Sequence, residues 1–419
     1  MARAWRESTA KDSSDTATSY PDPLNTFIWN AILERATDVH LHCVAGGVRV
    51  LHRVDGAVYP KRILGVDEGR KLLNQLKSAA GLDVTRAYCP LEGQIEWLDG
   101  NTSWEIRVTL TPVCNRESAH LRFLSVPTEQ WDVAGLGLSP VDRDNISGAV
   151  SSLSGLVLIT GPTGAGKTTT MYSLTSLMDL RTTTTFSIED PVEFRLPYAQ
   201  QIEVDERHGL TMHEGLRTIL RMDPDLILVG EIRDKDSAIV AARAALSGRL
   251  VLATIHAQDA AGAVDALHYL GVPYHIIGNS VRLIIAQNLV RKLCPACARP
   301  RDLDQSDREL FARFDVQPPA NLLEAATCGD CNWYGYKGRS GVFEVAPVDD
   351  ETATLINAGT HHRELVQCLR ARGVRSMAQD ALEKVANGIS SIDEISRVCG
   401  VAPSGDAVRA GAPVEVVAR

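Results

Sequence analysis

The chain has 419 residues, of which 44% are hydrophobic and 23% charged, with a formal net charge of −9. This length is enough for two or three domains, and the acidic balance excludes a general attraction to nucleic acid or anionic lipid. The first residues lack the apolar core of a signal peptide, and no run approaches the roughly 18 apolar residues of a membrane-spanning helix. We therefore expect a cytoplasmic protein with no nucleic-acid partner.

The first third of the chain predicts an α+β domain. Residues 1–20 are rich in Ser, Thr, Asp and Ala without periodicity, which predicts a disordered tail. Between residues 21 and 127, helical spacing alternates with extended runs, and one of these runs, 48–54, is closed by an Asp-Gly turn typical of a hairpin. Turn residues dominate the next segment, 128–150, which is interpreted as a linker with one short helix.

The most informative stretch is Gly-Pro-Thr-Gly-Ala-Gly-Lys-Thr at residues 161–168. It follows an apolar run and precedes a helical pattern, which is the context of a phosphate-binding loop. A chance match is on the order of one per cent for a chain this long. We expect Lys167 to contact the β- and γ-phosphates of ATP and Thr168 to bind Mg²⁺. The predicted nucleotide-binding residues are Gly161, Pro162, Thr163, Gly164, Ala165, Gly166, Lys167, Thr168 and Thr169.

Beyond this loop, apolar runs typical of parallel strands end in polar residues. One run precedes Glu189, a second precedes Gly230 and Glu231, and a third precedes His256. Because ligands bind off the carboxyl ends of parallel strands, these side chains are candidates for the same site, with Glu231 in the place of a Walker B acid. The alternatives are a surface glutamate at a strand end, a helix cap or solvated loop, and a structural histidine.

Three segments resemble the acidic box, the Walker B motif and the histidine box of the type II secretion and type IV pilus assembly ATPases. They are residues 187–193, 210–234 and 253–256. The resemblance covers about residues 25–400 and extends to the segments 36–40, 335–344 and 388–394. It implies a RecA-like P-loop NTPase motor domain behind a PAS-like N-terminal domain. It also implies a homo-hexamer that is peripheral at the inner membrane through a platform protein.

The resemblance further implies the roles of individual residues. Glu231, alone or with Glu189, would orient the attacking water, and His256 would sense the γ-phosphate. Arg107 and Arg122 match positions at which the family carries arginines facing bound nucleotide. The alternative is that both arginines are ordinary surface residues of strands.

The sequence departs from the family at several positions. Arg249 stands where a histidine is usual, Asn288 stands where an arginine is usual, and Leu91 and Glu92 precede Gly93 where Gln-Asp-Gly is usual. The extra domain with which larger members bind their membrane platform is not recognised. A nucleotide-bound scaffold without turnover is therefore one alternative. A conjugation or DNA-uptake ATPase is another, which the acidic balance disfavours.

Four of the nine cysteines form two C-x-x-C pairs, Cys294 with Cys297 and Cys328 with Cys331. Two such pairs supply four thiolates, which is the ligand set of a closed structural Zn²⁺ site. A redox pair is the competing interpretation. The resemblance agrees with zinc, because assembly-type members of the family often carry a tetracysteine subdomain.

The expected fold class is α/β, and the expected function is a hexameric ATPase motor for pseudopilus or type IV pilus assembly in protein secretion. The predicted division of the chain is a disordered tail (1–20), a PAS-like domain (21–127), a linker (128–150), a RecA-like ATPase core (151–292), a tetracysteine zinc subdomain (293–345), a C-terminal helical subdomain (346–401) and a flexible tail (402–419).

Overall fold

The computed structural model describes residues 22–86, 89–99, 102–114, 116–125 and 132–402. The chain divides into two compact units, Met1–Thr128 and Glu129–Arg419. The predicted tail at 1–20, and the C-terminal tail from residue 403 on, lie outside the described residues. Within the described ranges, no helix is both long and apolar enough to cross a bilayer.

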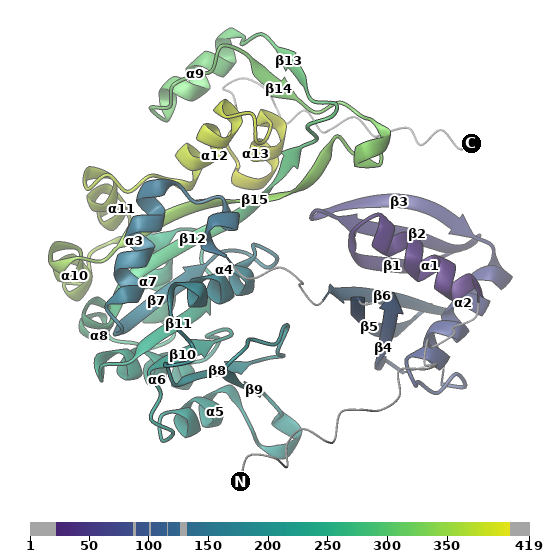
Figure 1. Ribbon diagram of the computed structural model, residues 1–419, viewed down its shortest axis with the longest axis horizontal. Coiled ribbons are helices and arrows are strands. Elements are labelled where there is room, and N and C mark those ends of the chain that lie inside the picture. The colour runs from purple at the N-terminus through teal and green to yellow at the C-terminus, as the bar shows by residue number, and fades with distance from the viewer. Residues whose placement is uncertain (1–21, 87–88, 100–101, 115, 126–131, 403–419) are drawn as a thin grey trace. The chain divides into compact units, whose positions relative to one another are not determined.

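The first unit is built on a six-stranded antiparallel sheet in the order β3-β2-β1-β6-β5-β4 (Figure 1). Its α+β composition is as predicted. Its elements are α1 (Asp22–Leu33), β1 (Ala36–Val44), β2 (Gly47–Val54), β3 (Ala57–Leu64), α2 (Val66–Ala79), β4 (Leu91–Asp99), β5 (Thr102–Val113) and β6 (Arg116–Ser125).

The two faces of this sheet differ in chemistry. Because side chains alternate along a strand, Val39 and Leu41 of β1 share one face with Leu121 of β6, and all three are fully buried. Helices α1 and α2 pack against this apolar face. The opposite face carries polar and charged side chains, among them Asp38 and Arg122.

The second unit contains a seven-stranded sheet in the order β15-β12-β7-β11-β10-β8-β9. Its strands are parallel except for β15, which pairs antiparallel with β12. The strands are β7 (Gly155–Thr160), β8 (Thr185–Glu189), β9 (Ala199–Glu203), β10 (Leu226–Val229), β11 (Leu250–Ile255), β12 (Val281–Leu293) and β15 (Tyr336–Pro347). The parallel strands predicted before Glu189, Glu231 and His256 are therefore confirmed.

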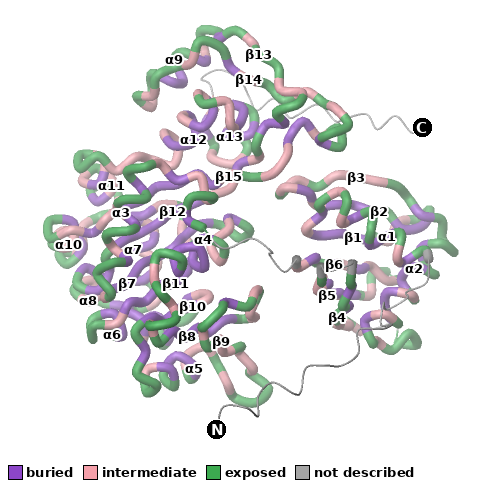
Figure 2. Tube along the Cα trace, viewed as in Figure 1, coloured by how far each residue is buried: buried purple, intermediate pink, exposed green. Residues whose placement is uncertain are grey.

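The central strands are covered on both faces. Every residue of β7, β10 and β11 is buried, as the continuous purple of the sheet shows in Figure 2. The helices are α3 (Pro140–Ser151), α4 (Lys167–Leu174), α5 (Met212–Ile219), α6 (Lys235–Leu246), α7 (Ala260–Tyr269), α8 (Tyr274–Ser280), α10 (Asp350–Asn357), α11 (His362–Ala371), α12 (Met377–Ala386) and α13 (Ile392–Cys399).

Alternate residues of β7 enter two different apolar cores. Leu156 and Leu158 pack with α5, α6, α7 and α11 on one face, whereas Val157 and Ile159 pack with α3 and α4 on the other. The second core also takes in residues from the described part of the predicted linker, namely Val133, Leu138, Ile146 and Val150. This segment therefore contributes to the hydrophobic core of the second unit.

Strands β12 and β15 lead out of the central sheet to the two cysteine pairs. Beyond them lie β13 (Arg299–Arg301), α9 (Gln305–Arg313) and β14 (Leu322–Glu324). A third core joins Val290 of β12 and Val342 of β15 with residues of α9, α12 and α13. The tetracysteine region is thus held by strands that belong to the sheet of the ATPase core. The finer boundaries at residues 292, 345 and 401 stay predictions.

Candidate nucleotide-binding site

The glycine-rich loop connects the end of β7 to the start of α4 and requires glycine at several positions. Gly161 has a φ of +151°, and a Cβ there would lie 2.2 Å from the carbonyl oxygen of Gln287. Gly166, with a φ of +84°, is the residue that caps α4. Gln287 also donates from Nε2 to the carbonyl oxygen of Ala165 at 2.7 Å. The neighbouring strand β12 therefore holds the loop in place.

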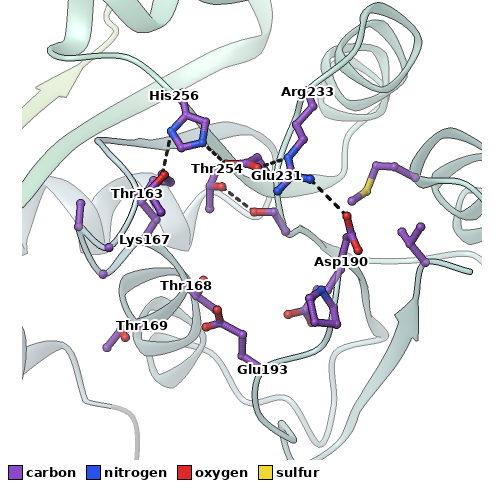
Figure 3. A pocket seen from close by; sticks show the side chains of 18 of the residues that line it. Thr163, Lys167, Thr168, Thr169, Asp190, Glu193, Glu231, Arg233, Thr254 and His256 are labelled. Carbon is purple, nitrogen blue, oxygen red and sulfur yellow. Dashed lines mark hydrogen bonds and ion pairs between the residues drawn. The ribbon is translucent and has the colours of Figure 1, made fainter. Parts of the chain in front are cut away.

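This loop borders a pocket of about 460 Å³, shown in Figure 3. The amino end of α4 points backbone N–H groups toward it, and an anion is favoured at such a helix terminus. The hydroxyls of Thr168 and Thr169 line the pocket, and neither hydrogen-bonds another residue in the described part of the chain. The residues present fit a nucleotide phosphate chain, with Thr168 free to act as a ligand of Mg²⁺.

Lys167 lies at the centre of the site and is held by the loop itself. Its Nζ donates to the carbonyl oxygen of Gly161 at 2.8 Å and lies 3.2 Å from Nδ1 of His256. Burial lowers the pKa of Lys167 and Arg233 lowers it further, while Glu231 opposes both effects. The Lys167 ammonium group therefore lies beside the loop as a partly buried cation. A bound phosphate would supply the negative charge that stabilises it there.

Glu231 follows β10 and lines the same pocket as this lysine. Its side chain is 15% exposed, and its Oε1 lies 2.6 Å from Nε2 of His256. Its Oε2 forms an ion pair with Arg233. His256 therefore connects the carboxylate to Lys167 of the phosphate loop, as the dashed lines in Figure 3 trace. The structure brings together Lys167, Glu231 and His256, which the sequence placed in three separate segments.

Glu189 lines the same pocket, but its carboxylate is engaged in a buried network. The residue is 2% exposed, and it accepts hydrogen bonds from Ser187 Oγ at 2.6 Å and Gln201 Nε2 at 3.2 Å. Tyr172 donates a third hydrogen bond, and burial together with this carboxylate raises the pKa of the tyrosine. A role for Glu189 in turnover stays a prediction. Glu193 of the same acidic box lies near Thr168 in Figure 3.

Two arginines of the pocket were missed by the sequence analysis. Arg233 pairs with Glu231 and also with Asp190, whose Oδ2 lies 3.2 Å from its Nη1. The hydrogen bond to Glu231 raises the pKa of Arg233. Arg339 lines the pocket from β15, more than 80 residues along the chain from His256. The nearness of Arg233 to Glu231 in sequence was a usable signal, and Arg339 lies within the segment 335–344 that resembles the family.

Arg107 and Arg122 lie in the first unit, on β5 and β6. They stand directly opposite each other in the antiparallel register of these strands. Nε of Arg107 lies 3.2 Å from Glu105, and Nε of Arg122 lies 3.1 Å from Asp38. The structure thus brings the two predicted arginines together on one face of a sheet. The phosphate loop belongs to the other unit.

The positions that depart from the family pattern lie in different surroundings. Arg249 precedes β11, at the end of the strand opposite to His256, and its Nη1 donates to Ser247 Oγ at 2.7 Å. It does not line the nucleotide pocket. Asn288 of β12 lies closer to the site, because it lines a neighbouring pocket together with Gly161 and Pro162.

The comparisons with known proteins agree on one family. A family model described as type II/IV secretion system protein matches residues 14–397. This chain belongs to that family. It is 37% identical to the type II secretion system protein E of Pseudomonas aeruginosa, over 90% of this chain and 74% of that protein. It is 34% identical to the type IV pilus assembly ATPase PilB of Myxococcus xanthus, over 89% of this chain and 66% of that protein.

A solved structure supports the fold of this secretion-family chain. The ATPase DotB of Legionella pneumophila aligns with a TM-score of 0.66 and 21% identity, covering 92% of this chain and 97% of that chain. The predicted α/β class with a RecA-like motor domain is confirmed, and so is membership of the secretion and pilus ATPase family.

The four predicted metal ligands of this family member converge at one point. The sulfur atoms of Cys294, Cys297, Cys328 and Cys331 all lie within 4.8 Å of one another. Three of the separations are 3.9, 3.9 and 3.8 Å. Zn–S bonds of about 2.3 Å at tetrahedral angles place neighbouring sulfurs about 3.8 Å apart. The spacing therefore fits a Zn²⁺ ion, and it is far longer than the bond of about 2.05 Å in a disulfide.

The surroundings of the sulfurs favour a thiolate at one of them. Burial raises the pKa of Cys331, but hydrogen bonds with the backbone of Cys328 and Gly335 outweigh it and bring the value to about 7. Burial raises the pKa of Cys297, and hydrogen bonds with the other three thiols raise it further, to about 12. A cation at the centre of the cluster would reverse this second shift by stabilising all four thiolates.

Proposed function

We propose that this chain is a hexameric ATPase motor that drives assembly of a pseudopilus or type IV pilus in protein secretion. The arrangement of Lys167, Glu231 and His256 around one phosphate loop carries this proposal. The names of the relatives support it, since one is a type II secretion protein E and another a pilus assembly ATPase. The protein would work in the cytoplasm, attached to the inner membrane through a platform protein.

The proposed chemistry relies on positioning and charge. Lys167 would move from the loop carbonyls to the β- and γ-phosphates, and Thr168 would hold Mg²⁺, which supplies positive charge at the phosphates when bound. Glu231 would orient the attacking water once its contacts with His256 and Arg233 rearrange. His256 touches both the carboxylate and the loop, so it is suited to report whether the γ-phosphate is present.

A scaffold that binds nucleotide without turnover is the main alternative, and the structure gives it little support. The carboxylate, the lysine and the histidine of the site are all present, and Arg249 lies at the far end of its strand. The test is release of inorganic phosphate from MgATP by the purified full-length protein. Turnover that depends on Lys167 supports the motor, and tight binding without turnover supports the scaffold. Secreted protein and pilus fibres, scored separately in cells, distinguish the two assembly systems.

Replacing both Arg107 and Arg122 with alanine is expected to lower the kcat of ATP hydrolysis by about 10²-fold, because two cations that face the phosphates during turnover are lost. The fold should persist, since both side chains lie on the polar face of the sheet, away from the apolar core. The measurement is steady-state hydrolysis alongside circular dichroism.

Arg116, at the start of β6, offers a matched control, because it is an exposed arginine that bonds the carbonyl oxygen of Val44 outside the Arg107 and Arg122 pair. Its alanine variant should hydrolyse ATP normally. If the double variant keeps wild-type hydrolysis, the first unit takes no part in catalysis.

We further propose that Cys294, Cys297, Cys328 and Cys331 bind one Zn²⁺ per chain. Four protein ligands leave no open position for water or substrate, so the role is structural. The first pair follows β12 and the second precedes β15, so the ion would close the connection between these two strands. The sulfur separations support this assignment over a redox pair.

Cys297→Ser is expected to lower the zinc content from about one ion per chain to a small fraction, because a hydroxyl is a poor ligand in a thiolate site. Residues 293–345 should then become sensitive to protease. Nucleotide binding should fall less than the zinc content, since the phosphate loop lies outside this range, although Arg339 within it lines the pocket. Metal analysis, limited proteolysis and nucleotide titration measure the three effects.

Cys368→Ser is the matched control, because Cys368 lies on α11 outside the cluster. It should keep both zinc and protease resistance. Wild-type protein that is purified without added zinc, contains none, and still protects residues 293–345 would contradict the assignment.

A further inference from the structure

A row of polar side chains that contains Asp38 crosses the polar face of the sheet in the first unit. The register of the strands places Arg53 opposite Asp38, Asp38 opposite Arg122, Arg122 opposite Arg107, and Arg107 opposite Gln94. Five strands, β2, β1, β6, β5 and β4, each contribute one residue. The row contains three arginines and one carboxylate, so the position of that carboxylate decides how the cations are arranged.

The pair of arginines at the centre of the row is unfavourable by itself. Side chains directly opposite each other in an antiparallel sheet have Cβ atoms about 4.5–5.5 Å apart, and like charges at this separation destabilise the pair. Arg107 and Arg122 are neighbours of this kind. Such an arrangement needs an anion nearby, either within the protein or as a bound ligand.

Asp38 supplies the internal anion, and it does so from a fixed position. The residue is 7% exposed. Its Oδ1 accepts hydrogen bonds from Arg122 Nε at 3.1 Å and His120 Nε2 at 3.0 Å, and its Oδ2 accepts one from Thr37 Oγ1 at 2.9 Å. Burial raises the pKa of Asp38, but these donors outweigh it and hold the pKa well below its ordinary value. The carboxylate is therefore charged and immobile.

The contact with Arg122 uses only one edge of the guanidinium. Asp38 binds Nε, and the two terminal Nη atoms hydrogen-bond no other residue in the described part of the chain. The Arg122 side chain is 56% exposed. A guanidinium held at Nε keeps both Nη atoms available for a two-pronged contact with phosphate oxygens.

We propose that Asp38 is a positioning residue, which holds Arg122 by Nε so that its Nη atoms face a phosphate of the bound nucleotide. This inference rests on the role proposed above for Arg122. Asp38 lowers the entropy that Arg122 loses when it engages the phosphate, and it offsets the repulsion from Arg107 in the absence of nucleotide.

Glu105 provides an internal comparison, because it binds Nε of Arg107 at 3.2 Å in a similar way. This pair lies on one strand, and both side chains are more than a third exposed. An exposed ion pair of this kind fixes a side chain only weakly. Asp38 is buried and accepts three hydrogen bonds, so its effect on the orientation of Arg122 is expected to be much larger.

The test is a double-mutant cycle on steady-state MgATP hydrolysis by the full-length chain, with wild type, Asp38→Asn, Arg122→Ala and the double variant. Asp38→Asn should lower kcat by about 10-fold and leave KM for ATP nearly unchanged. The Arg122 guanidinium would no longer be oriented, and this weakens binding of the transition state more than binding of ATP. The double variant should be no slower than Arg122→Ala alone. Glu105→Gln, the matched control, should stay within about twofold of wild type.

The outcomes separate this inference from the proposed function. If Arg122→Ala hydrolyses ATP at the wild-type rate, the role of Arg122 itself is wrong. If Arg122→Ala is slow but Asp38→Asn has normal kcat, or if the losses add in the double variant, Asp38 is structural and the inference is overturned. Asp38→Glu keeps the charge but displaces it by one methylene. This variant should have a melting temperature near that of wild type and a reduced kcat. It therefore tests the inference in the same way if Asp38→Asn does not fold.

Discussion

Lys167→Ala is expected to lower the kcat/KM of ATP hydrolysis by about 10³-fold, because the lysine supplies the main charge of the loop toward the β- and γ-phosphates. Its ammonium group now contacts the carbonyl oxygen of Gly161 and Nδ1 of His256. Lys167 also lines the nucleotide pocket, so a phosphate bound there would compete with these contacts for the ammonium group. Phosphate release and nucleotide titration measure turnover and binding separately.

The loss should not come from unfolding. Burial lowers the pKa of Lys167, so placing this cation in the loop is costly without an anion, and its removal should leave the melting temperature of the nucleotide-free protein unchanged or slightly higher. Lys235→Ala is a control at an exposed lysine outside the pocket, and it should be fully active. Normal hydrolysis by Lys167→Ala would show that the phosphate loop is not the site of turnover.

Glu231→Gln is expected to bind MgATP with nearly unchanged affinity and to lower kcat by about 10³-fold. Glutamine has the size of glutamate and can still hydrogen-bond His256. Its neutral amide cannot accept a proton from the attacking water, and it cannot orient that water with a full negative charge. The affinity should persist because the substitution leaves in place the phosphate loop and Lys167, which bind the phosphates in this proposal. Stopped-flow binding of a fluorescent ATP analogue, compared with phosphate release, separates the two steps.

Glu214→Gln is a suitable control for this substitution, since Glu214 is an exposed glutamate of α5 outside the pocket. It should not change turnover. An unchanged kcat in Glu231→Gln would show that this carboxylate is not the catalytic one. The acidic box would then be tested next, beginning with Glu193, which lines the pocket, before the buried Glu189.

Much of the site could be predicted from sequence because its signals are local. The spacing of Gly161, Gly164 and Gly166 before Lys167 follows from backbone geometry over eight residues, and the structure shows positive φ angles at all three glycines. The parallel strands before Glu231 and His256 were likewise readable as short apolar runs that end in polar residues. The two C-x-x-C pairs indicated a shared site through spacing alone, and their sulfurs do converge.

Other features were decided only by tertiary structure, because they depend on which strands pair and in which register. Glu189 and Glu231 both end apolar strands in the sequence, yet one carboxylate is buried under α4 and the other faces the phosphate loop. A one-residue difference in where a strand ends reverses the face to which a side chain points, and composition does not reveal it.

The sequence by itself determined the family, the phosphate loop and the cysteine pairs, because each depends on short motifs whose residues are close together along the chain. The neighbourhood of Asp38, Arg122 and Arg107, and the approach of Arg339 to the pocket, came only from the folded chain. The hydrogen bonds that align β1 with β6 join residues about 80 positions apart. Such pairings are selected by burial of the whole apolar face, which is a property of the complete sheet and not of any single segment.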